Sequence, residues 1–380
     1  MQEIPASLMR GGTSRGIVFR AEDLPSDEAE RLAIFRYALG SPDPSGRQVD
    51  GLGGGNSSTS KAAVLWRSPD PDYDVYYSFY QVSVGSREVD TRGNCGNLTA
   101  AAAAFAVNEG WASTDEPSTE VRIFNTNTQK RIIAHVPTRH GRAQVEGRHV
   151  VHGVPHPGAP IRLSFVRPGG AVTGKLLPTG RAQEQLALPS GEVCRVSIVD
   201  AANPIVLVAS EDLGVPATAL PPMIESNHEL LARLQAVREL AAVRIGLAAT
   251  PEEAREKSVA VPFVGFVGHP VEHDLLGGEH LEAADASLVV RFLSVGSPHR
   301  ALPLTAALCT AVASGIAGTL AQEARGASPT GTLVRLAHPS GILEVDACVV
   351  TDEGAWVAES ATVTLTARTI MRGGVWVPGG

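Results

Sequence analysis

The chain has 380 residues, of which 43% are hydrophobic and 19% charged, and its 32 basic and 40 acidic residues give a net charge of −8. These values are typical of a folded globular protein and exclude a disordered chain. The excess of acidic residues argues against a nucleic-acid-binding surface and against a basic membrane-binding patch. A chain of this length is expected to form two domains, and an anionic ligand would need a local basic pocket.

The four cysteines lie far apart in the sequence and form no CxxC pair. A disulfide framework and a cysteine-rich zinc site are therefore not expected. HExxH, GxSxG and EF-hand spacings are also missing, so we expect no metal site and no nucleotide cofactor. The first residues, MQEIPASLMRGG, do not have the pattern of a signal peptide, and we expect a cytoplasmic protein.

The first candidate site along the chain is the segment MRGGTSRG, residues 9–16. Arginine suits bidentate binding of a carboxylate, which makes Arg10 a candidate substrate-binding residue. Thr13 and Ser14 add hydroxyl groups beside two glycines and are candidates for the same role. The alternative is a turn that starts a strand and binds no ligand.

The segment GLGGGNSSTSK, residues 51–61, combines a flexible backbone with hydroxyl side chains and a lysine. Hydroxyl and backbone N–H groups in such a loop suit carboxylate or phosphate oxygens, so Ser58, Thr59 and Ser60 are candidate binding residues. Lys61 leads into the apolar run AAVLW, which should bury its aliphatic part and lower its pKa towards that of a usable base. The alternative is a solvated flexible loop.

This loop matches neither of the common phosphate-binding motifs. A Walker A loop has glycine before the lysine and a hydroxyl residue after it, whereas here Ser60 precedes Lys61 and Ala62 follows it. A dinucleotide-binding fingerprint ends in glycine where this chain has Asn56. A phosphate ester is therefore the less favoured ligand.

The segment DTRGNCGNLTAAAAAFAV, residues 90–107, places one cysteine ahead of an alanine-rich run that we predict to be a helix from about Leu98. A helix N-terminus exposes N–H groups and the positive end of the helix dipole. We therefore expect a lowered thiol pKa for Cys95, and we expect Gly96 and Asn97 to bind a substrate carboxylate. The alternative is a buried structural cysteine.

Three pairs of segments recur in the same order along the chain. The pairs are GIVFRAEDL (16–24) with IVLVASEDL (205–213), LTAA (98–101) with LTAA (304–307), and VRIFNTNTQKRIIAHV (121–136) with VRLAHPSGILEVDACV (334–349). Three matches in register indicate a duplicated chain. The last pair predicts a strand, a turn and a second strand in each half.

The duplication predicts two similar domains, 1–187 and 188–380, in each of which β-strands surround one apolar helix. The second such helix is expected in 301–321, which has no charged residue and is long enough to span a membrane but better fits a buried helix. We expect the two helix N-termini to face each other across a cleft. An outer helix is predicted in 225–257, and a connection between the halves is predicted around 153–191.

Candidate residues in the second half follow from the repeat. Asn203 stands in DAANP, which corresponds to part of the first candidate site, and SPHR brings His299 and Arg300 near the start of the second apolar helix. The repeat places Ala301 at the position that corresponds to Cys95. The other three cysteines are expected to be packing residues: Cys194, Cys309 and Cys348.

These motifs together resemble the PrpF family of isomerases, which have the α+β diaminopimelate-epimerase-like fold. The similar stretches lie between residues 8 and 341 and are LMRGGTSRGIVF, LGSPDPSGRQVDGLGGGNSSTSKAAVL, GNCGNLTAA, VRIFNTNTQKRIIAHVP, GKLLPTG, DAANPIVLV and RLAHPSG. The family includes methylaconitate cis–trans isomerases, methylitaconate isomerases and oxalomesaconate tautomerases, which act on unsaturated di- or tricarboxylates without a cofactor. The resemblance implies two domains, each a β-barrel-like sheet around a central helix, with the active site in the cleft between them.

The resemblance also implies which residues are catalytic. By motif, the family's catalytic lysine falls on Lys61 and its catalytic cysteine on Cys95. Epimerases of this fold use two opposed cysteines, so Ala301 argues for a proton shift along an allylic system and against stereoinversion. The chain departs from the family's usual sequence at four places: Arg15, Asn56, HPGAP at 156–160, and PF at 262–263, where a lysine is expected after the proline. These departures bear on which acid is the substrate.

The implied mechanism needs two proton-transfer groups. One of Lys61 and Cys95 removes an allylic proton and the other protonates the far carbon of the dienolate, and the sequence leaves open which of them is the base. Two alternatives stay open: an epimerase or racemase with His299 as its second group, and a non-catalytic carboxylate-binding accessory protein. The resemblance is also compatible with a homodimer and with functional pairing with an aconitase-like or hydratase enzyme.

Overall fold

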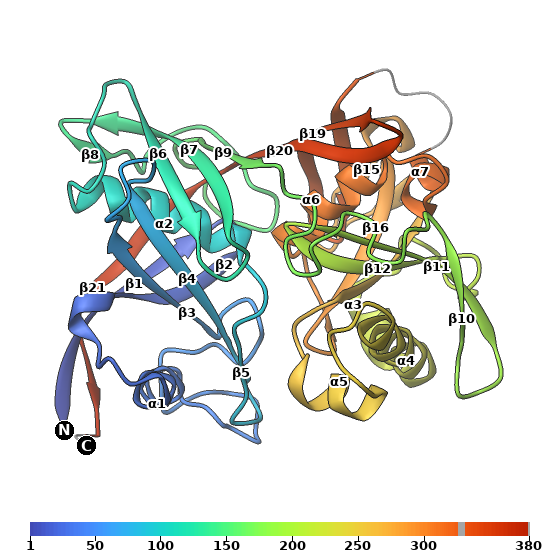
Figure 1. Cartoon of the computed structure of the whole chain (residues 1–380), viewed down its shortest axis with the longest axis horizontal. Helices are drawn as coiled ribbons and strands as arrows, with labels where there is room; N and C mark the ends of the chain where they lie inside the picture. The colour runs from blue at the N-terminus through green and yellow to red at the C-terminus, as the bar shows by residue number, and fades with distance from the viewer. Residues whose placement is uncertain (326–330, 379–380) are drawn as a thin grey trace. The chain divides into compact units, whose positions relative to one another are not determined.

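The computed structural model describes residues 1–325 and 331–378, which are shown in Figure 1. The chain divides into two compact units. The first unit consists of residues 1–163 and 364–380, and the second unit consists of residues 164–363.

The division differs from the one expected after residue 187. Strand β21 (Ala367–Val377) returns to the first unit and pairs antiparallel with β1 (Gln2–Gly11), so the first and the last strand lie side by side (Figure 1). Strand β10 (Glu184–Ala187), which precedes the expected boundary, pairs instead with β11 (Val193–Ala201) of the second unit. The pairing of β1 with β21 joins opposite ends of the chain, which local sequence patterns cannot connect.

The first unit is a curved set of strands with two α-helices. Its helices are α1 (Glu28–Leu39) and α2 (Gly96–Asn108), and a 3₁₀ turn, η1, covers Ala21–Asp23. Its further strands are β2 (Ser14–Arg20), β3 (Lys61–Arg67), β4 (Val75–Val82), β5 (Val89–Asp90), β6 (Ser118–Asn125), β7 (Lys130–Arg139), β8 (Arg142–Ala143) and β9 (Ile161–Val166), the last of which continues into the second unit.

Helix α2 forms the centre of the first unit, as predicted. It contacts strands β1, β2, β3, β4, β6, β7, β8 and β21, and every residue from Gly96 to Val107 is buried. A helix of alanines and other small residues has no polar face, so strands can pack against it on all sides. In Figure 1 the strands of this unit pass around α2.

The second unit has a larger set of helices. These are α3 (Pro221–Ser226), α4 (His228–Arg244), α5 (Pro251–Lys257), α6 (Leu304–Ala313), α7 (Leu320–Arg325) and the 3₁₀ turn η2 (Ala283–Asp285). Its further strands are β12 (Asn203–Ala209), β13 (Phe263–Gly268), β14 (His273–Asp274), β15 (His280–Leu281), β16 (Leu288–Ser294), β17 (Ser297–Pro298), β18 (Leu333–His338), β19 (Gly341–Asp352) and β20 (Ala355–Leu365).

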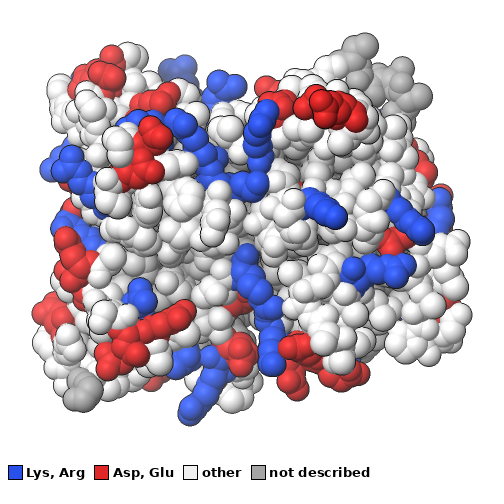
Figure 2. All heavy atoms as spheres, in the orientation of Figure 1, with Lys and Arg blue, Asp and Glu red and all other residues white. Residues whose placement is uncertain are grey.

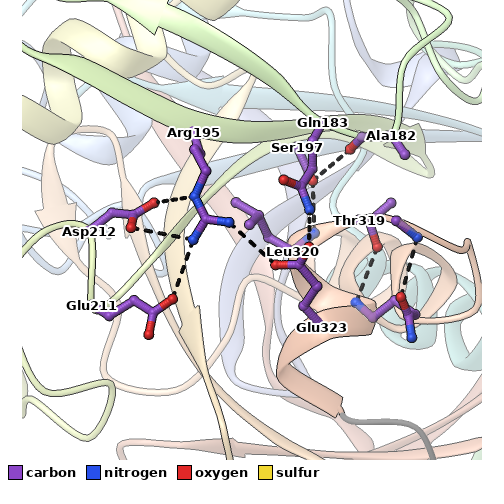
Figure 3. A network of polar contacts seen from close by, with 11 residues as sticks. Ala182, Gln183, Arg195, Ser197, Glu211, Asp212, Thr319, Leu320 and Glu323 are labelled. Atoms are coloured by element: carbon purple, nitrogen blue, oxygen red, sulfur yellow. Dashed lines mark hydrogen bonds and ion pairs between the residues drawn. The ribbon is translucent and has the colours of Figure 1, made fainter.

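Helix α6 is the buried centre of the second unit, and it contacts β11, β12, β18 and β19. The single helix expected over 301–321 is therefore wrong in length, because a turn around Gly318, with φ of +82°, separates α6 from α7. Figure 3 shows how polar contacts hold α7 against β11: Arg195 forms an ion pair with Glu323, and Ser197 accepts a hydrogen bond from Leu320. Among the residues that the structure describes, no helix is long and apolar enough to cross a membrane.

The strand pairing confirms the internal duplication. In the first unit the pairs β1–β2, β2–β3, β3–β4, β4–β6 and β6–β7 alternate between antiparallel and parallel. In the second unit the pairs β11–β12, β12–β13, β13–β16, β16–β18 and β18–β19 alternate in the same order. The central helix follows the fourth strand of the series in both units.

The outer helices differ in part from the prediction. The region 225–257 contains α4 and α5 rather than one helix, because Gly246 adopts a φ of +77° and Pro251 begins a new helix. Helix α1 was not predicted, although Asp27 caps its first turn by accepting a hydrogen bond from the N–H of Glu30.

Candidate active site

Lys61 is the first residue of β3, and its side chain is buried in the first unit. Its ammonium group donates a hydrogen bond to Oε1 of Gln81 at 2.6 Å and lies 5.0 Å from the centre of the Phe79 ring. Burial lowers the pKa of Lys61, while the charge of Cys95 and a hydrogen bond with its side chain act in the opposite direction. The expected lowering of the pKa is confirmed, and the lysine and the cysteine predicted from separate motifs interact.

Cys95 is the N-cap residue of α2, with an extended backbone. The helix begins at Gly96 and not near Leu98, so the first N–H groups of the helix follow the cysteine directly. Cys95 is 7% exposed, and its sulfur lies 4.0 Å from Oγ of Ser14. This position combines a thiol with the positive end of a helix dipole.

Tyr77, on β4, supports the backbone of Cys95. Its phenol donates a hydrogen bond to the carbonyl oxygen of Cys95 at 3.1 Å, and Thr99 donates to the same oxygen through its N–H and its hydroxyl. Burial, together with the charge of Cys95, raises the pKa of Tyr77 well above its usual value, so the phenol stays a donor. Sequence patterns did not identify this residue.

The turn between β1 and β2 packs against the start of α2. Asn97 accepts a hydrogen bond from the N–H of Thr13 and donates one from Nδ2 to the hydroxyl of Thr13 at 3.1 Å. A Cβ atom on Gly12 would overlap Oδ1 of Asn97, and one on Gly11 would overlap its carbonyl oxygen. The two glycines therefore allow this turn to lie close to Cys95, and the predicted residues Thr13, Asn97 and Cys95 are brought together.

The two arginines of the first motif have different surroundings. Nη1 of Arg10 donates to the carbonyl oxygens of Gly12 and Thr366, and burial together with Arg368 lowers its pKa. Arg15 donates from Nη2 to the carbonyl oxygen of Leu52, whereas its Nε is buried and has no hydrogen-bond partner among the described residues. Arg10 is thus engaged by the turn itself, and Arg15 has donor capacity left for an anion.

The hydroxyl residues of the 51–60 loop do not form one group. Ser58 donates to Oδ1 of Asn56 at 2.6 Å, and Thr59 donates to the carbonyl oxygen of the same asparagine at 3.3 Å. Ser60 is fully buried and accepts a hydrogen bond from Gln48. The loop is therefore held by internal contacts, and Ser60 supports the loop from within.

The candidates of the second unit have separate partners. Asn203 begins β12 and donates to Oγ1 of Thr305 on α6 at 2.8 Å. Nδ1 of His299 accepts from the N–H of Ala301, and the exposed Arg300 accepts a hydrogen bond from Ser340 through its carbonyl oxygen. The structure thus links Asn203 to the central helix, and it leaves the binding roles of all three residues as predictions.

Of the three remaining cysteines, Cys194 and Cys309 are buried, as expected for packing residues. Burial raises the pKa of Cys309 well above its usual value and also raises that of Cys194. The Cys309 sulfur accepts from the N–H of Ala201 and donates to the carbonyl oxygen of Val199. Cys348 is half-buried. Neither Cys309 nor Cys194 lies at a helix start.

On the face shown in Figure 2, Lys and Arg side chains lie among Asp and Glu side chains. Recognition of an anionic ligand would therefore depend on individual groups such as Arg15 and Lys61 and on the N-terminus of α2.

The repeated strand pairing around two apolar helices defines the class of protein. It is the diaminopimelate-epimerase-like fold predicted from the sequence. Within this class, the chain belongs to the PrpF family, because residues 1–378 match the family described as PrpF protein.

Three known proteins show how similar the chain is to other family members. It is 40% identical over 375 residues to 3-methylitaconate isomerase of Eubacterium barkeri, covering 98% of this chain and 97% of that protein. It is 37% identical over 388 residues to 2-methyl-aconitate isomerase of Cupriavidus necator, covering 99% and 98%. The crystal structure of a methylitaconate-delta-isomerase is 39% identical, covers 98% of this chain and 95% of that chain, and superposes with a TM-score of 0.79.

Proposed function

We propose that this protein is a cofactor-independent isomerase that shifts an allylic proton in an unsaturated di- or tricarboxylate. The observation that carries this proposal is the buried pair of Lys61 and Cys95, one at the start of a strand and the other at the start of a helix. Relatives similar over nearly the whole chain are named as isomerases of methylitaconate and methylaconitate. Methylaconitate, methylitaconate and oxalomesaconate are the acids that we propose to test.

The reaction needs one group that accepts a proton and one that donates. In one direction the base breaks the allylic C–H bond, the electron pair forms a dienolate with the conjugated carboxylate, and the acid protonates the far carbon. The double bond has then migrated, or has re-formed after rotation, and atoms and charge balance. The pair returns to its starting state by exchanging a proton between its members or with water. The lowered pKa of Lys61 makes its neutral amine accessible, which a base requires.

The dienolate carries negative charge that the site must stabilise. The N–H groups of Gly96 and Asn97 at the start of α2 are fixed donors close to Cys95. We propose that a remote carboxylate is bound by Arg15. Arg15 takes this role instead of Arg10, because its Nε has no partner while Arg10 is bound to two carbonyl oxygens.

The epimerase alternative is the less favoured reaction. It needs a second acid–base group in place of Ala301, and the thiol of Cys309 is buried inside α6 with a strongly raised pKa. His299 is the one titratable candidate that the repeat supplies near that position. A homodimer, a cytoplasmic location and pairing with an aconitase-like or hydratase enzyme, which would add water to the double bond, stay proposals.

The experiment that tests the proposal is proton NMR of the three acids with the purified protein. Conversion of one acid, lost in Lys61→Ala and in Cys95→Ala, is the expected result. Cys309→Ala is the matched control, because it removes a buried thiol from the corresponding helix of the second unit. Binding of an acid without conversion would contradict the proposal and would favour the carboxylate-binding accessory role.

A further inference from the structure

Gln81 faces Lys61 directly across two strands. The two residues are paired in the antiparallel ladder of β3 and β4, so their side chains emerge on the same face of the sheet. Both side chains are buried, and Oε1 of Gln81 accepts the hydrogen bond from Nζ of Lys61 at 2.6 Å. Gln81 is therefore a direct polar partner of the proposed catalytic lysine.

The orientation of the Gln81 carboxamide is determined by its other contacts. Its Nε2 donates to the carbonyl oxygens of Ser57 at 3.1 Å and Ser60 at 3.0 Å. A carbonyl oxygen only accepts hydrogen bonds, so a flipped amide would place an oxygen against two oxygens. The carboxamide oxygen is thereby directed at Lys61.

The same contacts tie Lys61 to the glycine-rich loop. Ser57 and Ser60 belong to the 51–60 loop, and Gln81 bonds both the loop and the lysine. Gln48 holds this loop from another side, since it accepts from the N–H of Gly55 and donates to Oγ of Ser60. The side chain of Gln48 also donates to Oγ of Ser41, and none of these side-chain hydrogen bonds is to Lys61.

A carboxamide at this position has a chemical consequence that a carboxylate would not have. It accepts a hydrogen bond from an ammonium group and from a neutral amine alike, so it orients the lysine without adding negative charge. Other groups near this lysine are Cys95 at the start of α2 and the ring of Phe79 on β4. Asp90, which pairs with Gln81 across β4 and β5, forms its ion pair with Arg92 at 3.6 Å.

We propose that Gln81 is a positioning residue that directs the Lys61 amine, couples it to the 51–60 loop and leaves it free to change its protonation state. This inference rests on the proposed role of Lys61 in proton transfer. It predicts that the identity of residue 81 sets the proton affinity of Lys61, whereas residue 48 affects the loop alone.

The test is a direct titration of Lys61 in the full chain. The protein contains four lysines, so lysine labelled with ¹³C at Cε gives four signals, and Lys61→Arg identifies the one from Lys61. Gln81→Glu should raise the titration midpoint of Lys61 by at least about one pH unit, which is a tenfold change in proton affinity. Gln81→Met, which removes the acceptor and adds no charge, should lower the midpoint.

Gln48→Met is the matched control, because it also releases the 51–60 loop but does not touch Lys61. It should leave the Lys61 midpoint within about 0.3 pH units of the wild type, a small fraction of the shift expected from a charged neighbour. Unchanged midpoints in both Gln81 variants, or equal shifts in Gln81→Met and Gln48→Met, would overturn the proposal. If Gln81→Glu does not fold, the comparison of Gln81→Met with Gln48→Met still tests the proposal.

A kinetic measurement separates this proposal from the proposed function. Gln81→Met should reduce kcat about 10- to 100-fold with a smaller change in KM, and Gln48→Met should mainly raise KM. The titration requires no substrate. Shifted midpoints combined with full activity of Lys61→Ala would therefore refute the proposed function and leave the contact between Gln81 and Lys61 established.

Discussion

The central helices α2 and α6 occupy equivalent places in two units with the same strand pairing, but their first residues differ in chemistry. Helix α2 begins after Cys95, whereas α6 begins after Pro303, and the repeat aligns Cys95 with Ala301. The thiol of the second helix, Cys309, lies inside α6 with a strongly raised pKa. Both units therefore have the same scaffold, whereas the titratable pair of Lys61 and Cys95 is present in the first unit.

The strand register extends this comparison to the lysine. Ile17 pairs with Ala62 in the first unit, and the corresponding Val206 pairs with Val264 in the second. The counterpart of Lys61 is therefore Phe263, one residue earlier, whose ring packs against Phe292. An aromatic residue stabilises the second unit at the position where the first unit carries a buried amine. The scaffold alone does not require a lysine there.

The largest effect is expected from the two titratable residues. Lys61→Ala and Cys95→Ala should each reduce turnover about 1000-fold, because each removes one of the two proton-transfer groups. Cys309→Ala should change turnover less than about threefold, since this buried thiol belongs to the second unit and bonds to backbone groups of Val199 and Ala201. Turnover of the converted acid, measured for the three variants side by side, checks this difference between the units.

A second prediction concerns the turn that lies against α2. Gly12→Ala should reduce the free energy of unfolding by about 3 kcal/mol, because the residue has a φ of +48° and the new Cβ would overlap Asn97. Gly110→Ala is the control: its φ is +68°, but its Cβ would meet open space, so about 1 kcal/mol is expected. Equal losses in urea unfolding would show that the close approach to Asn97 carries no cost.

The two arginines of the first motif should respond differently to substitution. Arg15→Lys should raise KM about tenfold with little change in kcat, because lysine lacks the planar donors that bind a carboxylate. Arg10→Lys should instead lower stability, since Arg10 bonds the carbonyl oxygens of Gly12 and Thr366. Steady-state kinetics and urea unfolding of both variants measure the two effects. A raised KM in Arg10→Lys together with a loss of stability in Arg15→Lys would instead identify Arg10 as the binding residue.

The smallest predicted effect is a pH dependence of stability. Because burial lowers the pKa of Lys61 in the folded protein, the unfolded chain binds the proton more tightly between that pKa and about 10.4. The free energy of unfolding should therefore rise with pH across this window, by about 1.4 kcal/mol per unit of lowering. Lys61→Met should lack this rise. Parallel pH profiles for the wild type and the variant would contradict the buried, deprotonatable lysine.

Sequence patterns predicted the parts of the molecule that depend on local chemistry. The alanine-rich run after Cys95 predicted a buried helix, and the apolar residues after Lys61 predicted a buried lysine. The repeat predicted two similar units. Helix α1 was missed although its cap residues, Asp27 and Gly40, are readable in the sequence.

The parts that were not predicted depend on contacts between distant segments. Gln81 becomes the partner of Lys61 through the register of β3 and β4, and nothing local distinguishes it from another strand glutamine. Arg15 differs from Arg10 because of where the 51–60 loop packs. The boundary of the units depends on the pairing of β21 with β1, which lie at opposite ends of the chain.

We propose that Lys61 and Cys95 divide the roles of base and acid, and hydrogen exchange into the substrate in D₂O distinguishes these roles. The two variants to compare are Lys61→Ala and Cys95→Ala. The one that keeps the base should exchange the allylic hydrogen of the converted acid for deuterium without moving the double bond. The variant that lacks the base should show neither exchange nor isomerisation. Wild-type rates of exchange and isomerisation in both variants would contradict the claim and would place the proton transfer on other residues.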